Sequence, residues 1–294
     1  MRVIHGQGLS LDFNSLNIGL DSQSSNSDLI FISHAHTDHL ISKTKTPVLT
    51  SRLTADLMTL RTKHEHYFIH DFLDIKMIDS GHVLGGKALI VKGDTKLLYT
   101  GDFTTYDRFF LKGLKPVKCD DLIIETTYGL PEYDLPKPAD TINRARDVIT
   151  DDLANGHSVV LLGYALGKSQ IISKLVENFN DVYSSKDVSD ISSVCKNHGF
   201  DVPVFGELPK DKNNFIYLTT NKKRLDTHKS RVYSFTGWGA KGVTDCFPLS
   251  DHAGFKELLW FVKNCKPERV YTHHGFSEEF ASLLRVEGIN AKAL

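Results

Sequence analysis

The sequence predicts an α/β fold, and three observations support this prediction. Short apolar runs such as Leu29–Ile32 alternate with polar, turn-forming residues in the first part of the chain, which is typical of β-strands. Apolar residues recur with helical spacing in Ser51–Lys63 and again in Thr141–Asn155. From residue 141 onward, helix, strand, glycine turn and helix follow one another, which is the order of a parallel α/β unit.

The expected elements follow the chain in a regular order. In the first part we expect strands at Leu9–Phe13, Asn17–Asp21 and Leu29–Ile32, a helix at Ser51–Lys63, and strands that begin at Ile75, Lys96 and Asp121. The proline-rich stretch 131–139 predicts a crossing between domains. Behind it we expect helices at Thr141–Asn155, Gly167–Asn178 and Gly254–Asn264, and strands at Ser158–Gly163, Phe215–Leu218, Arg231–Thr236, Cys246–His252 and Arg269–Gly275. Residues 180–214 give no clear pattern.

Composition narrows the class of protein. Apolar residues make up 40% and charged residues 24% of the 294 residues, as in ordinary globular proteins. No apolar run reaches the roughly 18 residues of a membrane-spanning helix, and the N-terminus lacks the apolar core of a signal peptide. We therefore expect a cytoplasmic protein without a membrane partner. The four cysteines are widely spaced, which argues against a thiolate zinc site.

Charge limits how the chain could bind nucleic acid. The net charge is −1, so binding would need a local basic patch rather than a general positive field. The most basic stretch contains Lys222, Lys223 and Arg224, and Lys168 lies at the start of an expected helix, where an anion could bind. A solvated charged surface explains the basic stretch about equally well. The glycine spacing before Lys168 does not match a P-loop, which excludes a nucleoside triphosphatase of that type.

Three histidines and an aspartate lie close together directly after Leu29–Ile32. They are His34, His36, Asp38 and His39. Surface loops favour Gly, Ser, Asn and Asp over alternating histidines, so a chance cluster in a loop is a weak explanation. Imidazole nitrogens and carboxylate oxygens are the ligands of zinc ions that catalyse hydrolysis. The stretch therefore predicts part of a hydrolytic metal site.

Later strands also end in residues that can bind a metal or transfer a proton. These residues are His82, Asp102, Glu125, His252 and His274. Glycines precede His82 and Asp102, and glycine lets the backbone approach a buried group closely. Asp12 and Asp21 also lie at strand ends, where either could orient a ligand imidazole, although turn capping explains each of them alone.

Taken in chain order, these residues resemble the metallo-β-lactamase superfamily. The pattern H-x-H-x-D-H is complete at 34–39, and Gly81-His82, Gly101-Asp102 and His274-Gly275 follow in the order of the superfamily. Four stretches are similar to motifs of its β-CASP nuclease branch, namely 125–129 (ETTYG), 164–170 (YALGKSQ), 250–253 (SDHA) and 272–275 (THHG). The resemblance covers nearly the whole chain.

The resemblance implies a specific architecture and set of roles. The fold would be a metallo-β-lactamase αβ/βα four-layer sandwich, formed by residues 1–132 and 236–294, with a small α/β β-CASP cap at 133–235. One zinc ion would be held by His34, His36 and His82, a second by Asp38, His39 and His274, with Asp102 bridging the two. His252 would give a proton to the leaving oxygen and Glu125 would orient it, with Asp38 as a further catalytic residue. Asp21 resembles the carboxylate that orients a ligand histidine, and Asp12 is its rival.

The activity implied by the resemblance is zinc-dependent hydrolysis of phosphodiester bonds. RNA is the expected substrate, in RNA processing or 3′-end maturation, and the alternative is a DNA exonuclease of the repair-associated branch that acts on single-stranded DNA. Glu125 and His252 argue against hydrolysis of a small thioester or lactam. The complete ligand set argues against a non-catalytic binding protein. A homodimer is compatible with the resemblance.

Overall fold

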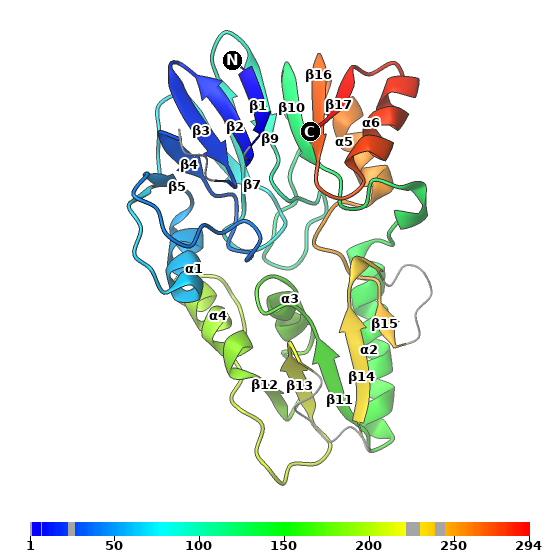
Figure 1. The fold of residues 1–294 in the computed structure, drawn as a ribbon. Coiled ribbons are helices and arrows are strands. Elements are labelled where there is room, and N and C mark those ends of the chain that lie inside the picture. Colours follow the sequence, from blue (N-terminus) through cyan, green and yellow to red (C-terminus); the bar gives the residue numbers. More distant parts are fainter. Residues whose placement is uncertain (1, 7, 23–26, 222–229, 239–244) are drawn as a thin grey trace. The chain divides into compact units, whose positions relative to one another are not determined.

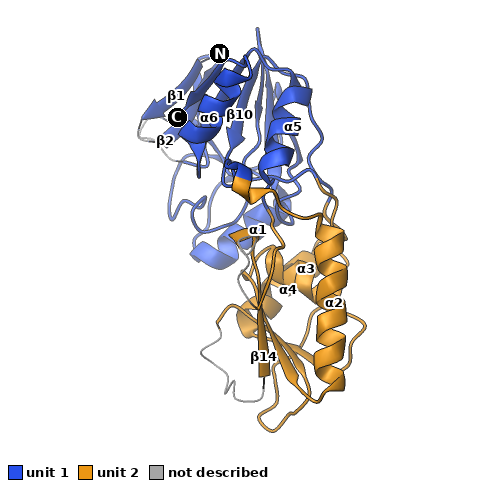
Figure 2. Ribbon diagram, turned by 90° about the vertical axis from the view of Figure 1, so that its right-hand side faces the viewer, with its two compact units in different colours: residues 1–105, 112–131, 252–294 blue, residues 106–111, 132–251 orange. Residues whose placement is uncertain are grey.

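The computed structural model describes residues 2–6, 8–22, 27–221, 230–238 and 245–294. The chain forms two compact units, which Figure 2 shows in separate colours. Unit 1 comprises Met1–Thr105, Lys112–Pro131 and His252–Leu294, and unit 2 comprises Tyr106–Leu111 and Glu132–Asp251. Unit 2 extends beyond the expected 133–235 because strand β15 (Cys246–Phe247) pairs in parallel with β14 (Ser230–Phe235).

Among the described residues, unit 1 contains two six-stranded sheets (Figure 1). The first has the order β1-β2-β3-β4-β5-β6 and is formed by Arg2–Gly6, Gly8–Phe13, Leu16–Leu20, Leu29–Phe31, Val48–Leu49 and Phe68–Ile69. The second has the order β17-β16-β10-β9-β8-β7 and is formed by Ala291–Ala293, Arg269–His273, Asp121–Glu125, Lys96–Tyr99, Lys87–Lys92 and Ile75–Asp79.

Three apolar clusters hold unit 1 together in layers. Leu11, Ile18 and Phe31 of the first sheet share a buried cluster with Leu89 and Ile123 of the second, so the two sheets pack face to face. The outer face of the second sheet is covered by α5 (Phe255–Cys265) and α6 (Ser277–Val286), which Figure 1 shows beside β16 and β17.

Helix α1 (Arg52–Thr62) completes the stack of layers in unit 1. Its Met58 is buried against Ile30, Ile32 and Val48 of the first sheet and the loop after it. The order of layers is therefore helix, sheet, sheet, helix, which confirms the αβ/βα four-layer sandwich.

Unit 2 is a parallel α/β unit. Its sheet has the order β12-β13-β11-β14-β15, and every pair of neighbouring strands is parallel. The remaining elements are β11 (Ser158–Leu162), β12 (Val182–Ser184), β13 (Ile216–Thr219), η1 (Pro131–Tyr133), α2 (Pro138–Ala154), α3 (Lys168–Leu175) and α4 (Lys186–Asn197). All carboxyl ends of the strands consequently lie along one edge of this sheet, where ligands of open parallel sheets bind.

Local sequence explains where the helices of unit 2 begin and which face they bury. Pro138 occupies the first turn of α2, where its missing N–H costs nothing, and Ile142, Ala145 and Ile149 form the buried face. Helix α4 was not expected from the sequence, although Val188, Ile191 and Cys195 recur with helical spacing and are buried. Among the described residues, no helix combines the length and apolar character needed to cross a membrane.

Candidate metal centre

The loop after β4 carries the stretch H-x-H-x-D-H and is fixed by a carboxylate at the end of β3. Asp21 Oδ1 accepts a hydrogen bond from Ser33 N, and Oδ2 accepts one from Ser33 Oγ, both at 2.6 Å. The backbone of Gly101 also approaches this loop, because a Cβ there would lie 2.7 Å from Ser33 Cβ. Only glycine permits this approach, which brings Asp102 beside His34.

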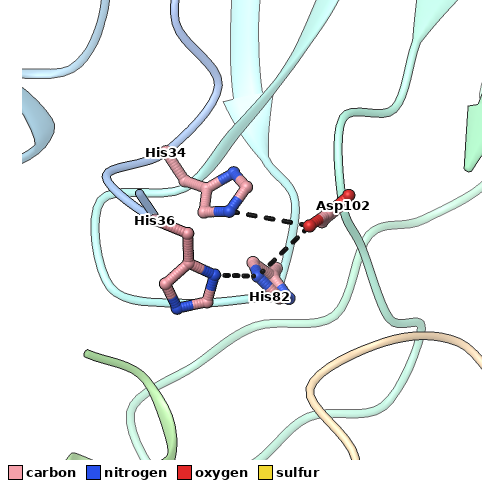
Figure 3. Close-up of side chains that lie close together, drawn as sticks. All are labelled: His34, His36, His82 and Asp102. Atoms are coloured by element: carbon pink, nitrogen blue, oxygen red, sulfur yellow. Dashed lines mark hydrogen bonds and ion pairs between the residues drawn. The ribbon is translucent and has the colours of Figure 1, made fainter. Parts of the chain in front are cut away.

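Four side chains gather into one group of potential metal ligands (Figure 3). They are His34, His36, His82 and Asp102, and each offers a ligand atom within 4.8 Å of the others. Asp102 Oδ2 lies 3.6 Å from His34 Nε2 and 3.6 Å from His82 Nε2, and His82 Nε2 lies 3.0 Å from His36 Nδ1. The structure therefore brings together the side chains that were predicted to hold the first ion.

Two residues predicted for a second ion, His39 and Asp38, lie near the same carboxylate, Asp102, or near each other. His39 Nε2 is 3.3 Å from Asp102 Oδ2 and 3.8 Å from Asp38 Oδ2. The ring of His274 is tilted against that of His39, with 5.5 Å between the centroids. Asp38 is less tightly enclosed than the others, since its side chain is 78% exposed. Asp102 Oδ2 thus lies within 3.6 Å of imidazoles from both predicted ligand sets, as the predicted sharing of this carboxylate requires.

The electrostatics of this group suit a cation. Burial, and then the neighbouring His39, His82 and His36, lower the pKa of His34 well below its usual value, so its imidazole is neutral. Its buried Nε2 has no hydrogen-bond partner among the described residues. Although burial acts in the opposite direction, His39 and His252 hold the pKa of Asp102 well below its usual range. The neutral imidazole of His34 beside the ionised carboxylate of Asp102 offers a nitrogen and an oxygen to a divalent ion such as zinc.

Asp21, rather than Asp12, contacts the predicted metal ligand His39. Asp21 Oδ2 lies 3.0 Å from His39 Nδ1 and accepts a hydrogen bond of 2.7 Å from Tyr99 OH. Asp12 instead accepts a hydrogen bond from Asn17 Nδ2 within the β2–β3 hairpin. A proton held on His39 Nδ1 by Asp21 leaves Nε2 free to face Asp102, which is how carboxylates orient metal-binding histidines.

Glu125 and His252 form a carboxylate–imidazole pair beside Asp102. His252 Nδ1 lies 3.0 Å from Glu125 Oε1 and 4.0 Å from Asp102 Oδ2. Glu125 is fully buried and also accepts hydrogen bonds from Phe103 N at 3.2 Å and Thr127 N at 2.9 Å. These bonds fix the carboxylate at the end of β10, so Glu125 can hold a proton on Nδ1 of His252 and leave Nε2 for proton transfer.

A cavity of about 230 Å³ opens beside the second set of ligands. Its lining includes Asp38, His39 and His274, together with His5, Ser22 and Tyr99. The exposed side chains of Asp38 and His274 thus border a space that can hold more than a single water molecule.

The adjacent histidines at the end of β16 have different environments. His273 is buried, and its burial, followed by the neighbouring His274, lowers its pKa to about 3. His274 is exposed and has a φ of 57°, and Gly275 follows with the same value. A Cβ at Gly275 would lie 2.5 Å from the carbonyl oxygen of Thr126, so this position requires glycine. Both histidines line the cavity, and His274 is the one that is exposed.

One predicted nucleic-acid contact needs correction. Lys168 was expected to offer its charge to phosphate, but it is buried, and its Nζ donates to the carbonyl oxygen of Leu249 at 2.6 Å and lies 3.1 Å from Asp251 Oδ2. Its charge is therefore compensated inside unit 2 and does not reach solvent. The other three predicted contacts, Lys222, Lys223 and Arg224, lie outside the described residues.

Sequence reasoning missed residues that support the ligands. Tyr99 bonds Asp21, and burial, followed by Asp21, raises its pKa well above the usual value, so it remains a donor. Ser33 bonds Asp21 through both its backbone and its hydroxyl group. Ser33 precedes the first ligand and could have been found from its position, whereas Tyr99 is one of many strand residues and no local pattern distinguishes it.

Comparisons with known proteins agree with this geometry. No family model matches the chain. It is 31% identical to a "Probable DNA ligase" of Opitutus terrae over 292 residues, which cover 90% of this chain and 28% of that protein. It is 25% identical to the "5' exonuclease Apollo" of Gallus gallus, covering 90% of this chain and 61% of the relative. It is 23% identical to "RNase aCSPSF2" of Saccharolobus solfataricus, covering 72% of this chain and 54% of the relative. The chain thus spans about a quarter to three-fifths of these proteins.

A solved structure supports the fold. A protein of unknown function from Enterococcus faecalis V583 superposes with a TM-score of 0.61 at 15% identity, covering 88% of this chain and 78% of that one. The H-x-H-x-D-H loop, the ligands at later strand ends, the four-layer sandwich and the sequence matches agree. The chain belongs to the metallo-β-lactamase superfamily, in its β-CASP branch.

Proposed function

We propose that this chain is a metal-dependent nuclease that hydrolyses phosphodiester bonds by means of two zinc ions. The observation that carries the proposal is the position of Asp102 Oδ2, which lies within 4.0 Å of His34, His39, His82 and His252. One carboxylate thus joins both sets of metal ligands to the His252–Glu125 pair. Hydrolysis of a phosphodiester needs both an activated water and a proton for the leaving oxygen, and this arrangement supports both.

The roles of the residues follow from their chemistry. His34, His36 and His82 would hold one ion, Asp38, His39 and His274 the other, and Asp102 would contact both. Bound there, the ions would make water a nucleophile near neutral pH and offset the charge of the phosphate. Glu125 stabilises the charged form of His252, which can then give the proton on Nε2 to the leaving oxygen. Asp21 keeps His39 in the tautomer that leaves Nε2 available.

Single-stranded DNA is our first candidate substrate. Two relatives that each match 90% of this chain carry names that refer to DNA or to a 5′ exonuclease. RNA, which the sequence analysis favoured, is the second candidate, because a relative named as an RNase matches 72% of the chain. In the proposed reaction the site would act on phosphate and water, which are common to the hydrolysis of DNA and RNA, so it would accommodate either backbone.

A cleavage assay with end-labelled strands tests this proposal. The protein is incubated with single-stranded DNA and RNA of the same sequence, with zinc or with a chelator. Asp38→Ala serves as the inactive control. We expect cleavage of DNA that zinc supports and the chelator abolishes. Cleavage of RNA alone would overturn the choice of DNA, and cleavage of neither strand by the zinc-loaded protein would overturn the nuclease assignment.

A further inference from the structure

Three exposed aromatic side chains belong to unit 2. Among the described residues, the exposed aromatics of the whole chain are Tyr67, Phe109, Tyr164, Trp238 and Trp260. Of these, Phe109, Tyr164 and Trp238 lie in unit 2 and are 39%, 69% and 47% exposed. Single exposed apolar residues are common and need no explanation, so the significance of these three depends on where they lie.

Two of the three follow neighbouring strands of the parallel sheet. Strand β11 pairs with β14 in a register that places Leu162 opposite Ser234. Tyr164 comes two residues after Leu162 and Trp238 comes four residues after Ser234, so both lie at the carboxyl edge of the sheet. This is the edge at which open parallel sheets bind their ligands.

Phe109 is tied to the same edge by a buried group of charges. Its neighbour Arg108 donates through NH1 to the carbonyl oxygen of Ser250 at 2.8 Å and to Asp251 Oδ1 at 2.7 Å. Ser250 and Asp251 follow β15, which is the neighbour of β14. Lys168, in the turn after Tyr164, lies 3.1 Å from the other oxygen of Asp251. Arg108, Lys168 and Asp251 therefore connect the loops that contain Phe109 and Tyr164 to the segment that follows β15.

Neighbouring residues support the ring of Trp238 and the backbone of Phe109. The ring of Trp238 meets the buried Tyr133 edge to face, with 5.1 Å between centroids and an interplanar angle of 87°. Phe109 has a φ of 44°, an uncommon conformation for a bulky residue that needs support from its surroundings. That support comes from the reciprocal backbone bonds between Arg108 and Leu111. Rigid, exposed rings lose little conformational entropy on binding a flat partner.

We infer that Phe109, Tyr164 and Trp238, here called the aromatic edge, stack on the unpaired bases of a single-stranded nucleic acid. The inference rests on the proposed nuclease function and adds to it a surface that binds bases rather than phosphate. All three side chains are aromatic, and Val204 is the one other large apolar residue of unit 2 that is exposed among the described residues. Stacking on aromatic side chains tolerates any sequence, which suits a nuclease without base preference.

A binding assay in the presence of a chelator tests the aromatic edge without turnover. The probes are a fluorescent single-stranded oligo-dT of about 20 nucleotides and an abasic strand of the same length. Tyr164→Ala and Trp238→Ala should each raise Kd for oligo-dT roughly tenfold, and Phe109→Ala should act in the same direction. Trp260→Ala is the matched control, because Trp260 is 49% exposed but lies on α5 of unit 1. It should leave Kd unchanged, and the abasic strand should bind weakly to every variant.

Tryptophan fluorescence gives a second readout, because the chain contains only two tryptophans. In Trp260→Phe the remaining Trp238 should be quenched by oligo-dT, and in Trp238→Phe the remaining Trp260 should not. Unchanged Kd in all three alanine variants, or equal binding of abasic and normal strands, would overturn the inference. Loss of self-association in these variants, without weaker DNA binding, would assign the edge to contact between copies and would likewise overturn it.

The two proposals can fail separately in these experiments. Cleavage by the wild type with no effect of the three substitutions on Kd would remove the aromatic edge and leave the nuclease. Binding that depends on the aromatic edge in a protein that cleaves neither strand would do the reverse.

Discussion

Each unit buries a group of charged and polar side chains, and the two groups differ in what their side chains can bind. In unit 2, Arg108 and Lys168 take one oxygen each of Asp251 and also bond the carbonyl oxygens of Ser250 and Leu249. In unit 1, Asp102 faces several imidazoles, and the buried Nε2 of His34 has no hydrogen-bond partner among the described residues. Burial of charge is common to both groups, but the group in unit 1 presents an imidazole nitrogen that can bind a metal ion, whereas the cations of unit 2 are a guanidinium and an ammonium group, which cannot.

The largest effect should come from removing the shared carboxylate. Asp102→Ala should lower the rate of cleavage by roughly a thousandfold or more, because it removes a ligand from both ion positions. Metal content, measured by mass spectrometry of the purified protein, should fall with it. Asp94→Ala, in the exposed turn between β8 and β9, is the control and should change neither quantity. Normal metal content in Asp102→Ala would contradict the prediction that Asp102 binds metal and would indicate a structural role for the group in unit 1.

Removing the carboxylate of Asp251 in unit 2 should lower the stability of the fold and leave metal binding intact. Asp251→Ala leaves Arg108 and Lys168 buried without their anion, so the free energy of unfolding should fall by about 3–5 kcal/mol. Lys168→Met should cost far less, because Arg108 and Asp251 remain paired. Urea unfolding measures both variants. Loss of metal from Asp251→Ala that remains folded would contradict the distinction between the groups.

A smaller effect should separate the two candidate orienting carboxylates. Asp21→Asn should weaken metal binding roughly 10- to 100-fold, because His39 loses the anion that fixes its tautomer. Asp12→Asn changes the same type of residue in the same hairpin region and should bind metal like the wild type. Competition with a chromogenic chelator measures both affinities, and equal losses in the two variants would refute the assignment of Asp21.

The smallest effect should be a dependence of stability on alkaline pH in unit 2. Tyr233 OH donates to Asp152 Oδ2 at 2.6 Å, and burial, followed by Asp152, raises the pKa of Tyr233 to about 12. The unfolded tyrosine titrates near 10, so the contribution is complete below about pH 10 and is lost as pH rises through 12. It should stay below about 1 kcal/mol, because solvent reaches the side chain. Urea midpoints of wild type and Tyr233→Phe should therefore converge between pH 9 and pH 12, and a constant difference would disprove the coupling.

The sequence was informative where ligands lie at strand ends. The stretch 34–39 and the later His82, Asp102 and His252 could be found because their residue types are rare in such positions. Which carboxylate serves His39 could not be found, since Asp12 and Asp21 look alike until β3 and β4 pair and bring Ser33 to Asp21.

Lys168 shows that a local sequence pattern cannot reveal a partner that is distant in the chain. A glycine followed by a lysine at a helix start predicts an anion site, but the partner of Lys168 is Asp251, which lies far along the chain. Helix α4 was missed for a different reason, because Ser189, Ser192 and Ser193 lower its helical propensity, and packing of its apolar face decides its structure.

The left-handed pair His274-Gly275 sets a limit on how this centre could be re-engineered. The side chain of His274 is exposed, and the carbonyl oxygen of the residue is held by Thr126 Oγ1 at 2.6 Å, so the backbone position does not depend on the imidazole. A different ligand, such as Asp, can be placed there to alter metal preference while the chain path is kept. Gly275 offers no such freedom, because any side chain would collide with Thr126 and displace the neighbouring His274, which is the predicted ligand.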